Sequence, residues 1–170
     1  RLSVRIAVAV SGGVDSLCAL LLLRRAGHDV LALHGFFLPE QPQPPPGDAC
    51  DPLPGLEAAC RALNLPLRTM DLRAVFQREV MTPFAKSYAE GRTPNPCAHC
   101  NRAVKFGALL DAALSLGADK LATGHYARLL SGRQGEKDAP PFLAAAHDRA
   151  KDQSYFLSLV PAARLRYALF

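Results

Sequence analysis

The chain has 170 residues, of which 49% are hydrophobic and 21% are charged, and its formal net charge is +5. This length and apolar content suffice to bury one α/β core, whereas two full domains would fit only tightly. The apolar runs are too short to cross a bilayer, and the first one leads directly into a glycine turn, so we expect neither a membrane protein nor a secretory signal. The basic excess agrees with a polyanionic partner without selecting one.

Strand and helix patterns alternate along the chain. We predict strands at residues 6–10, 30–33, 65–70 and 119–123. We predict helices at residues 17–25, 56–63, 74–88 with a possible break at Pro83, 101–116, 151–160 and 162–170. This order predicts an α/β fold with a doubly wound, mostly parallel, Rossmann-like sheet that has helices on both faces. Ligands of such sheets bind at the carboxyl ends of the strands.

Two segments are expected to lie outside this framework. Residues 39–54 hold seven of the fourteen prolines, so we expect an exposed, flexible loop there rather than a helix or a central strand. Residues 132–141 form a polar turn region, as at the tip of a hairpin.

The chain has five cysteines, an odd number, which argues against a disulfide scaffold and for reduced thiols in a cytoplasm. Cys18 and Cys60 lie in apolar stretches and are expected in the core, whereas Cys50 lies in the proline-rich loop. Cys97 and Cys100 form a CxxC pair that precedes a predicted helix, and they have a separate interpretation.

The turn after the first predicted strand is the most informative motif, with the sequence VAVSGGVDS at residues 8–16. Backbone N–H groups at such a strand-to-helix turn converge and carry partial positive charge, which suits phosphate. The Walker pattern is absent, because no Gly-Lys-Ser/Thr follows. An ordinary turn with Asp15 or Ser16 as the helix N-cap is the alternative.

This motif resembles the PP-loop, Ser-Gly-Gly-x-Asp-Ser, of ATP pyrophosphatases, which cleave ATP to AMP and pyrophosphate while adenylating a substrate oxygen. The resemblance implies ATP as a cofactor, with Mg²⁺ near Asp15. It assigns the phosphates to Ala9, Val10, Ser11, Gly12, Gly13, Val14, Asp15 and Ser16. Gly35 and Gly124, at the ends of two other predicted strands, would line the adenosine side.

Four further blocks follow in order: GRTPNP at residues 91–96, CNRAVKFGALL at 100–110, ATGHYAR at 122–128 and KDQSYFL at 151–157. With the PP-loop they resemble the catalytic domain of the tRNA-specific 2-thiouridylases, which place sulfur on C2 of the wobble uridine. The resemblance spans the chain except residues 39–54 and 132–141. It implies a PP-loop catalytic domain at residues 1–150. Residues 151–170 would be a tRNA-contacting helical segment that leads to a C-terminal region beyond the chain, and the start at Arg1 rather than Met also suggests a fragment.

The resemblance also implies a mechanism and its residues. ATP would adenylate the uridine C2 oxygen, and a persulfide on the catalytic Cys100, loaded by a sulfur-donor protein, would replace it. Only a thiolate is useful here, and the field of the helix predicted from Asn101, with His99 adjacent, would favour it. The positions that match tRNA contacts are Asn95, Pro96 and Cys97 for the extruded base, and Lys151, Asp152 and Gln153. The alternative for the last three is a solvated helix start. His125 could touch phosphate or cap the sheet edge, and His34 carries no clear signal.

Two departures from the family pattern concern the sulfur chemistry. The family usually has Asp where this chain has Cys97, and no cysteine follows Cys100. Cys97 could be a second catalytic residue that resolves the persulfide, since a CxxC at a helix start is a redox arrangement. An iron–sulfur cluster with a third cysteine is possible but not favoured. A zinc site would lack two ligands, so no resident metal site is predicted.

Two other functions compete with an ATP-dependent tRNA sulfurtransferase. One is another PP-loop adenylating enzyme, such as an amidotransferase synthetase or a tRNA lysidine-type ligase, which needs no cysteine nucleophile. The other is a nucleotide-binding or RNA-binding module without catalysis. All three are expected in the cytoplasm, without a membrane partner.

Overall fold

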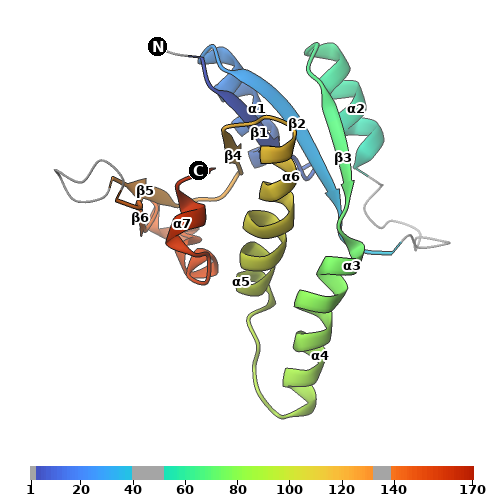
Figure 1. Cartoon of the computed structure of the whole chain (residues 1–170), viewed down its shortest axis with the longest axis vertical. Coiled ribbons are helices and arrows are strands. Elements are labelled where there is room, and N and C mark those ends of the chain that lie inside the picture. Colours follow the sequence, from blue (N-terminus) through green and yellow to red (C-terminus); the bar gives the residue numbers. More distant parts are fainter. Residues whose placement is uncertain (1–2, 40–51, 132–138) are drawn as a thin grey trace.

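A five-stranded parallel sheet forms the centre of the molecule. The computed structural model describes residues 3–39, 52–131 and 139–170, and Figure 1 shows the sheet with its strands in the order β3-β2-β1-β4-β7. The strands are β1 (Arg5–Ala9), β2 (Asp29–Phe36), β3 (Leu67–Asp71), β4 (Lys120–Ala122) and β7 (Ala168–Leu169). The predicted α/β fold is confirmed. The order reverses at β1, so the carboxyl ends of β1 and β4 form the edge where such sheets bind ligands.

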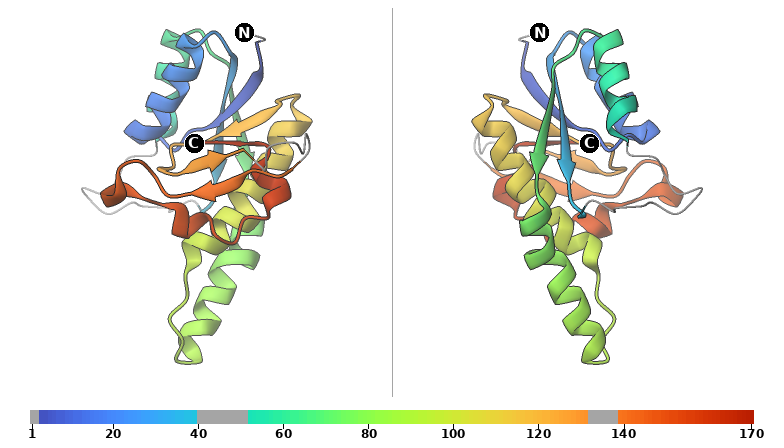
Figure 2. Two further views of the ribbon diagram at one scale, coloured as in Figure 1. Left: turned by 90° about the vertical axis from the view of Figure 1, so that its left-hand side faces the viewer. Right: turned by 90° about the vertical axis from the view of Figure 1, so that its right-hand side faces the viewer.

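Both faces of the sheet are buried, and β1 shows why. Ile6 and Val8 contribute to one apolar cluster, and Ala7 between them contributes to the other. Because successive side chains of a strand point to opposite faces, this continuous apolar run requires cover on both sides. Figure 2 shows that cover, with α1 and α2 on one side and α6 on the other. The covering helices are α1 (Val14–Arg25) and α2 (Leu53–Ala62), and opposite them η2 (Asn101–Leu109) and α6 (Leu110–Ser115).

Two helical rods extend from the sheet toward the bottom of Figure 1. The first contains α3 (Arg73–Phe76), the π-helical η1 (Gln77–Met81) and α4 (Thr82–Ala89), and the second contains α5 (Pro96–Cys100), the π-helical η2 and α6. The break considered at Pro83 does not occur. Instead, the hydrogen-bonding pattern changes from π to α just before Pro83, and the N–H of Thr82 bonds to the carbonyl of Gln77. Since the wider π turn relieves the clash between the proline ring and the preceding turn, the helix continues.

The C-terminal twenty residues differ from the prediction. Residues 162–170 form only a short helix, α7 (Ala162–Leu165), before β7 pairs with the outer edge of β4. Residues 151–160 form 3₁₀ turns, η3 (Arg149–Lys151) and η4 (Ser154–Leu157), rather than an α-helix. Residues 168–169 form a strand in place of the predicted helix because the open edge of β4 offers backbone hydrogen-bond partners. One such bond joins Thr123 N to Leu169 O at 3.1 Å.

The two irregular segments are only partly described. The strands β5 (Arg128–Leu130) and β6 (Phe142–Ala144) pair antiparallel on either side of the predicted hairpin tip. Within residues 39–54, the expected flexible loop lies largely outside the described residues, but α2 begins at Leu53. Pro54 therefore sits in the first turn of a helix, where a missing N–H has no intrahelical partner to lose.

Cys18, expected in the core, is exposed on α1, because Ser16 and Leu20 form the buried face of that helix. Cys60 is buried as predicted. Among the described residues, no helix combines the length and the apolarity needed to span a membrane.

The core under η2 and α6 should dominate the stability of the fold. Leu110 is fully buried there, so Leu110→Ala should lower the free energy of unfolding by about 2–5 kcal/mol, through lost burial and the cavity left behind. Leu22→Ala is the matched control, because Leu22 is 64% exposed in α1 and should change stability by about 0.5 kcal/mol or less. Urea denaturation of both variants measures the difference, and equal losses would contradict this account of the core.

Candidate active site

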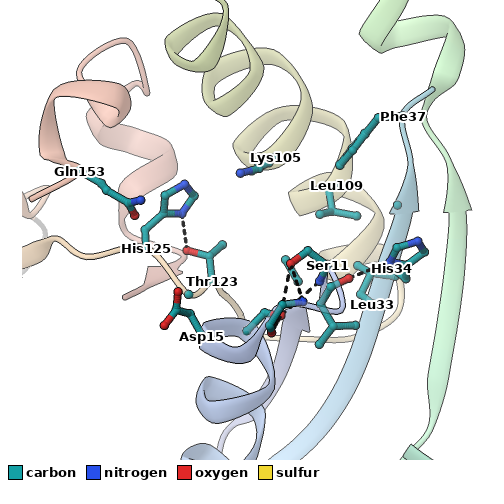
Figure 3. A pocket seen from close by; sticks show the side chains of 16 residues that line it. Ser11, Asp15, Leu33, His34, Phe37, Lys105, Leu109, Thr123, His125 and Gln153 are labelled. Carbon is teal, nitrogen blue, oxygen red and sulfur yellow. Dashed lines mark hydrogen bonds between the residues drawn. The ribbon is translucent and has the colours of Figure 1, made fainter. Parts of the chain in front are cut away.

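A pocket of about 340 Å³ opens at the carboxyl ends of β1, β2 and β4. Figure 3 shows the side chains that converge on it from the loop after β1, from β2, from η2 and from the segment after β4. Most of the residues predicted for ATP line this pocket: Ala9, Val10, Ser11, Gly13, Asp15, Ser16, Gly35 and Gly124. The other two, Gly12 and Val14, are exposed and lie outside its lining.

The loop after β1 is held by its own hydroxyl groups. Ser16 is buried, donates to the carbonyl of Gly13 at 2.8 Å and accepts from the N–H of Ser11 at 3.2 Å. The N-cap of α1 is Gly13, and no side chain of the described residues caps the helix. The alternative in which Asp15 or Ser16 caps the helix is therefore wrong, and the first turn keeps N–H groups available for an anion.

Two glycines permit the close approaches that shape the loop. Gly12 has φ +88°, and a Cβ on it would lie 2.5 Å from the Cβ of Pro52. A Cβ on Gly124 would lie 3.0 Å from the backbone carbon and Cβ of Asp15 and from the nitrogen of Ser16. The chain leaving β4 thus packs directly on the first turn of α1, which only glycine allows.

Several lining residues were not predicted from the sequence. Lys105 and Thr123 line the pocket, and both fall within blocks that carry the family resemblance, so those blocks held the signal. His125, for which the sequence left a phosphate contact open, also lines the pocket. His34 is buried with its Nδ1 2.8 Å from the carbonyl oxygen of Val10. This contact with Val10 could not be predicted from the sequence, because it depends on the pairing of β1 with β2. Phe37 adds an aromatic wall.

His125 is a neutral imidazole at physiological pH. Burial, with a smaller contribution from the ammonium of Lys105, lowers its pKa to about 4. Its Nδ1 lies 2.7 Å from the hydroxyl of Thr123, and its ring packs near those of Phe106 and Phe170. Figure 3 shows Lys105 pointing from η2 toward His125. The site therefore holds one fixed cation beside a histidine that resists protonation.

The CxxC pair lies early in the second helical rod. Asn95 is the N-cap of α5, and its Oδ1 accepts from the N–H of Ala98 at 3.2 Å. The helix thus begins at Pro96 and not at Asn101, which puts Cys97 in its exposed first turn and Cys100 one turn further in.

The expectation that a helix N-terminus favours the thiolate of Cys100 is consequently wrong. Burial raises the pKa of the Cys100 thiol, the ammonium of Lys105 acts against that rise, and the thiol of Cys97 adds to it. The field of a helix end falls off within the first turn, so it acts on Cys97 more than on Cys100. Lys105 is the cation that favours the charged form of Cys100.

The π-helical η2 explains how Lys105 reaches both Cys100 and the pocket. In a π turn, the N–H of residue i+5 bonds to the carbonyl of residue i, and this wider turn leaves Lys105 close enough for its ammonium to act on the Cys100 thiol. Gly107 lets the kink form, because a Cβ there would lie 3.1 Å from the carbonyl oxygen of Arg102. The guanidinium of Arg164 donates to the carbonyls of Phe106 and Gly107 at 2.8 and 2.9 Å, which satisfies groups at the kink.

The strip formed by Lys151, Asp152 and Gln153 contacts the segment that follows β4. The carboxylate of Asp152 accepts from the N–H of Ala146 at 2.8 Å and from both donors of Ser154, and chiefly the Ala146 bond lowers its pKa. Asp152 thus braces its own loop, as an Asp at a local turn often does. Gln153 lines the pocket, and Lys151 is exposed. The cysteine helix is tied to this region by Asn101, whose Nδ2 donates to the carbonyl of Phe156 at 2.9 Å.

Residues 4–170 match the family model described as the tRNA methyl transferase HUP domain. The chain belongs to this family. Among curated relatives, the tRNA-specific 2-thiouridylase MnmA of Nitratidesulfovibrio vulgaris (strain Miyazaki F) is 51% identical, and that of Oleidesulfovibrio alaskensis is 52% identical. These alignments cover 98% and 97% of this chain and 46% of each relative. The chain therefore spans about half the length of the relatives it matches.

The resemblance to the 2-thiouridylases that the five sequence blocks indicated is confirmed. A more distant relative of the same name, from Moorella thermoacetica, is 44% identical over 95% of this chain and 46% of its own length. Among solved structures, a U34-tRNA thiolase from Methanococcus maripaludis superimposes with a TM-score of 0.45 at 19% identity, over 74% of this chain and 39% of that one, which is too remote to bear on the site.

The described part of this HUP-family chain holds no group of three or more His, Cys, Asp or Glu side chains that could bind a metal ion. Cys60 lies in the apolar cluster beneath α1 and α2, on the opposite face of the sheet from Cys100. Cys18 lies on α1, which covers that same opposite face. Cys50, the other candidate third ligand for a cluster with the CxxC pair, lies outside the described residues.

Replacing Lys105 should move two titrations at once. In Lys105→Gln the pKa of the Cys100 thiol should rise further, because the ammonium stabilises the thiolate. The pKa of His125 should rise from about 4, because the ammonium destabilises the protonated imidazole. The pH dependence of iodoacetamide alkylation at Cys100, read by peptide mass spectrometry, and the ¹H–¹⁵N shifts of His125 measure these changes. Lys86→Gln, at an exposed pair with Glu90, is the control. Unchanged titrations in Lys105→Gln would contradict the assigned role of Lys105.

Burial of neutral His125 should make the fold acid-sensitive. Above pH 6.5 the imidazole is neutral in both states, and its full contribution to stability is present. As the pH falls from 6.5 toward 4, the unfolded state takes up a proton that the folded state refuses, so the free energy of unfolding should drop by up to about 3 kcal/mol. Denaturation at a series of pH values should show this drop in His147→Asn, the control at an exposed histidine. In His125→Asn the free energy of unfolding should depend less on pH. Parallel profiles in the two variants would refute the role of His125.

Proposed function

We propose that this chain is the catalytic part of an ATP-dependent tRNA 2-thiouridylase, which adenylates the C2 oxygen of the wobble uridine and replaces it with sulfur. One observation carries the proposal. The loop of ATP-pyrophosphatase type and η2, which continues directly from the helix of the two cysteines, meet at a single pocket. Neither Cys97 nor Cys100 lines this pocket, but Lys105 lines it and also acts on the pKa of Cys100. An adenylating enzyme without sulfur chemistry has no need of a thiol coupled to its nucleotide site.

The chemistry of the pocket matches ATP. The uncapped first turn of α1 and the loop at residues 11–16 would receive the phosphates. Leu33 and Phe37 give an apolar wall of the kind that holds an adenine. A nucleotide is also the ligand expected at the reversal point of a parallel sheet.

Mg²⁺ fits the donor set as a companion of the phosphates and not as a resident ion. The described residues form no cage of three ligands, but Mg²⁺ is usually held by one or two carboxylates together with phosphate oxygens and water. Asp15, exposed at the pocket beside the loop, would supply that carboxylate. The ion would neutralise charge on the departing pyrophosphate.

The reaction balances in two stages. The uridine C2 oxygen attacks the α-phosphorus of ATP, and pyrophosphate leaves. The terminal sulfur of a Cys100 persulfide then attacks C2, and AMP leaves with the former oxygen. Cys97, on the same face of the helix one turn earlier, attacks the Sγ of Cys100. The S–S bond breaks, its electron pair stays with the sulfur on C2, and a Cys97–Cys100 disulfide forms for later reduction by a cellular thiol.

The surroundings of the pair support these roles. Cys97 is exposed and Cys100 is half-buried, so a persulfide donor protein can reach the helix while the reacting thiol stays partly shielded from water. Lys105 would stabilise the anionic sulfur. Reduced thiols and tRNA both occur in the cytoplasm, where we place the activity.

For RNA recognition we propose the residues that match the family, Asn95, Pro96 and Cys97 near the base and the strip at Lys151 and Gln153. Exposed Tyr155, in the turn that follows the strip, offers a stacking surface for an unpaired base. We assign the nucleotide chemistry to residues 1–150, and we assign to residues 151–170 the RNA contacts other than those at the base. The latter segment shares the core of the domain through Leu157, Leu165 and Ala168.

The cysteine variants test the proposal. Cys100→Ser should keep tRNA-dependent pyrophosphate release and reduce formation of 2-thiouridine by roughly 10³-fold or more, because adenylation needs no thiol and sulfur delivery does. Cys97→Ser should permit sulfur loading of Cys100 but stall delivery until an external thiol is added. Cys18→Ser, at an exposed cysteine on α1, is the control. Thiolation that persists in Cys100→Ser would sink the mechanism, and pyrophosphate release with a non-RNA substrate would favour another PP-loop enzyme.

A further inference from the structure

Tyr126 connects two parts of the site that the sequence treats as separate. Its hydroxyl donates to Oδ1 of Asp15 at 3.1 Å, across the start of α1. Its backbone N–H donates to Oε1 of Gln153 at 3.0 Å, and its carbonyl accepts from the N–H of Gln153 at 2.8 Å. The ammonium of Lys151 lies 5.3 Å from the centre of its ring. One residue thus touches the phosphate loop and two members of the strip.

We propose that Tyr126 is a positioning residue that makes the Asp15 carboxylate depend on whether RNA occupies the strip formed by Lys151, Asp152 and Gln153. Because it names a partner for Asp15 at the nucleotide site, the inference rests on the proposed function. Tyr126 holds Asp15 in the absence of RNA and releases it to the cation that accompanies ATP when RNA binds.

The bond between Tyr126 and Asp15 is suited to exchange. At 3.1 Å it is longer than the usual O–H···O hydrogen bond, and the Asp15 side chain is exposed. A divalent cation with phosphate oxygens is a stronger partner for a carboxylate than a phenol is. The hydroxyl occupies Oδ1, one of the two oxygens through which Asp15 can hold the cation. In this proposal it therefore reduces the affinity for the metal–nucleotide complex until it is withdrawn.

A movement of the strip can withdraw the Tyr126 hydroxyl from Asp15, because the strip holds Tyr126 in place. The backbone N–H and the backbone carbonyl of Tyr126 both bond to Gln153, and the ring faces the Lys151 ammonium. An RNA phosphate is a better partner for that ammonium than an aromatic face in contact with water. A phosphate bound to Lys151 draws the ammonium away from the Tyr126 ring, and Tyr126 shifts together with the strip.

The consequence is a thermodynamic coupling between two ligands. If RNA releases Asp15, RNA must tighten the binding of Mg²⁺–ATP, and Mg²⁺–ATP must tighten the binding of RNA by the same factor. ATP would then be bound most tightly when a substrate for adenylation is present, which limits wasteful hydrolysis.

The test measures binding by calorimetry on the full chain, with a non-hydrolysable ATP analogue, Mg²⁺ and unmodified tRNA. In the wild type, saturating tRNA should tighten analogue binding by about fivefold or more. In Tyr126→Phe the analogue should bind about that much more tightly without tRNA, and tRNA should then add less than about twofold. A residue with a merely structural role would weaken binding when altered, so a gain of affinity from a lost hydroxyl distinguishes the two roles.

Two further arms sharpen the outcome. With EDTA in place of Mg²⁺, the wild type and Tyr126→Phe should bind the analogue equally, because Asp15 acts through the cation. Lys151→Met, measured at saturating tRNA, should lose the coupling as Tyr126→Phe does. Tyr88→Phe, the same chemical change at an exposed residue of α4, should behave as the wild type.

Weaker or unchanged analogue binding in Tyr126→Phe, with the tRNA effect retained, would overturn the inference and leave the proposed function standing. A wild-type protein that binds neither the analogue nor tRNA would overturn the proposed function itself. The variant keeps the aromatic ring, and an unchanged melting temperature checks that the fold is intact.

Discussion

The close packing of Gly124 on the first turn of α1 is the constraint from which the rest of the site follows. With 3.0 Å between its Cβ position and the backbone of Asp15, no other residue lets the chain leave β4 at this point. That contact brings Thr123, His125 and Tyr126 to the loop after β1. It also brings the strip that is bonded to Tyr126, so the loop after β1 and Gln153 of the strip line one pocket.

The second helical rod positions Cys100 and Lys105 relative to each other through its π turn. An α-helix from Asn95 would turn Lys105 away from Cys100, whereas the π turn leaves its ammonium close enough to act on the thiol. Such a turn leaves carbonyls without their usual partners, and Arg164, held by Asp111 at 2.6 Å, supplies donors to two of them. The kink is thus maintained by a residue near the C-terminus, which ties the reactive helix to the segment that ends in β7.

Electrostatically the site is built around one cation and two groups whose burial opposes charge. Burial raises the pKa of the Cys100 thiol and lowers that of the His125 imidazole to about 4, and Lys105 acts on both. A thiol with a raised pKa is a weak nucleophile, because only the thiolate reacts. In the mechanism that we propose, this thiol carries sulfur as a persulfide, and its partial burial, the adjacent cation and an exposed Cys97 one turn away suit that role.

The sequence by itself determined the sheet core and the loop at Ser11 to Ser16, because these depend on local patterns: a continuous apolar run at Ile6–Val8 and glycines at a strand end. It misplaced the start of the helix that carries the CxxC pair, which lies at Pro96 and not at Asn101. Other features were decided by the tertiary structure. β7 is a strand only because β4 offers an open edge, and Lys105 reaches Cys100 only through a kink braced by Arg164. The pKa of Cys100 rises because distant segments bury it, and Tyr126 meets Asp15 because two strand ends pack together. Each of these depends on groups far apart in the chain, whose mutual distance and burial no local pattern records.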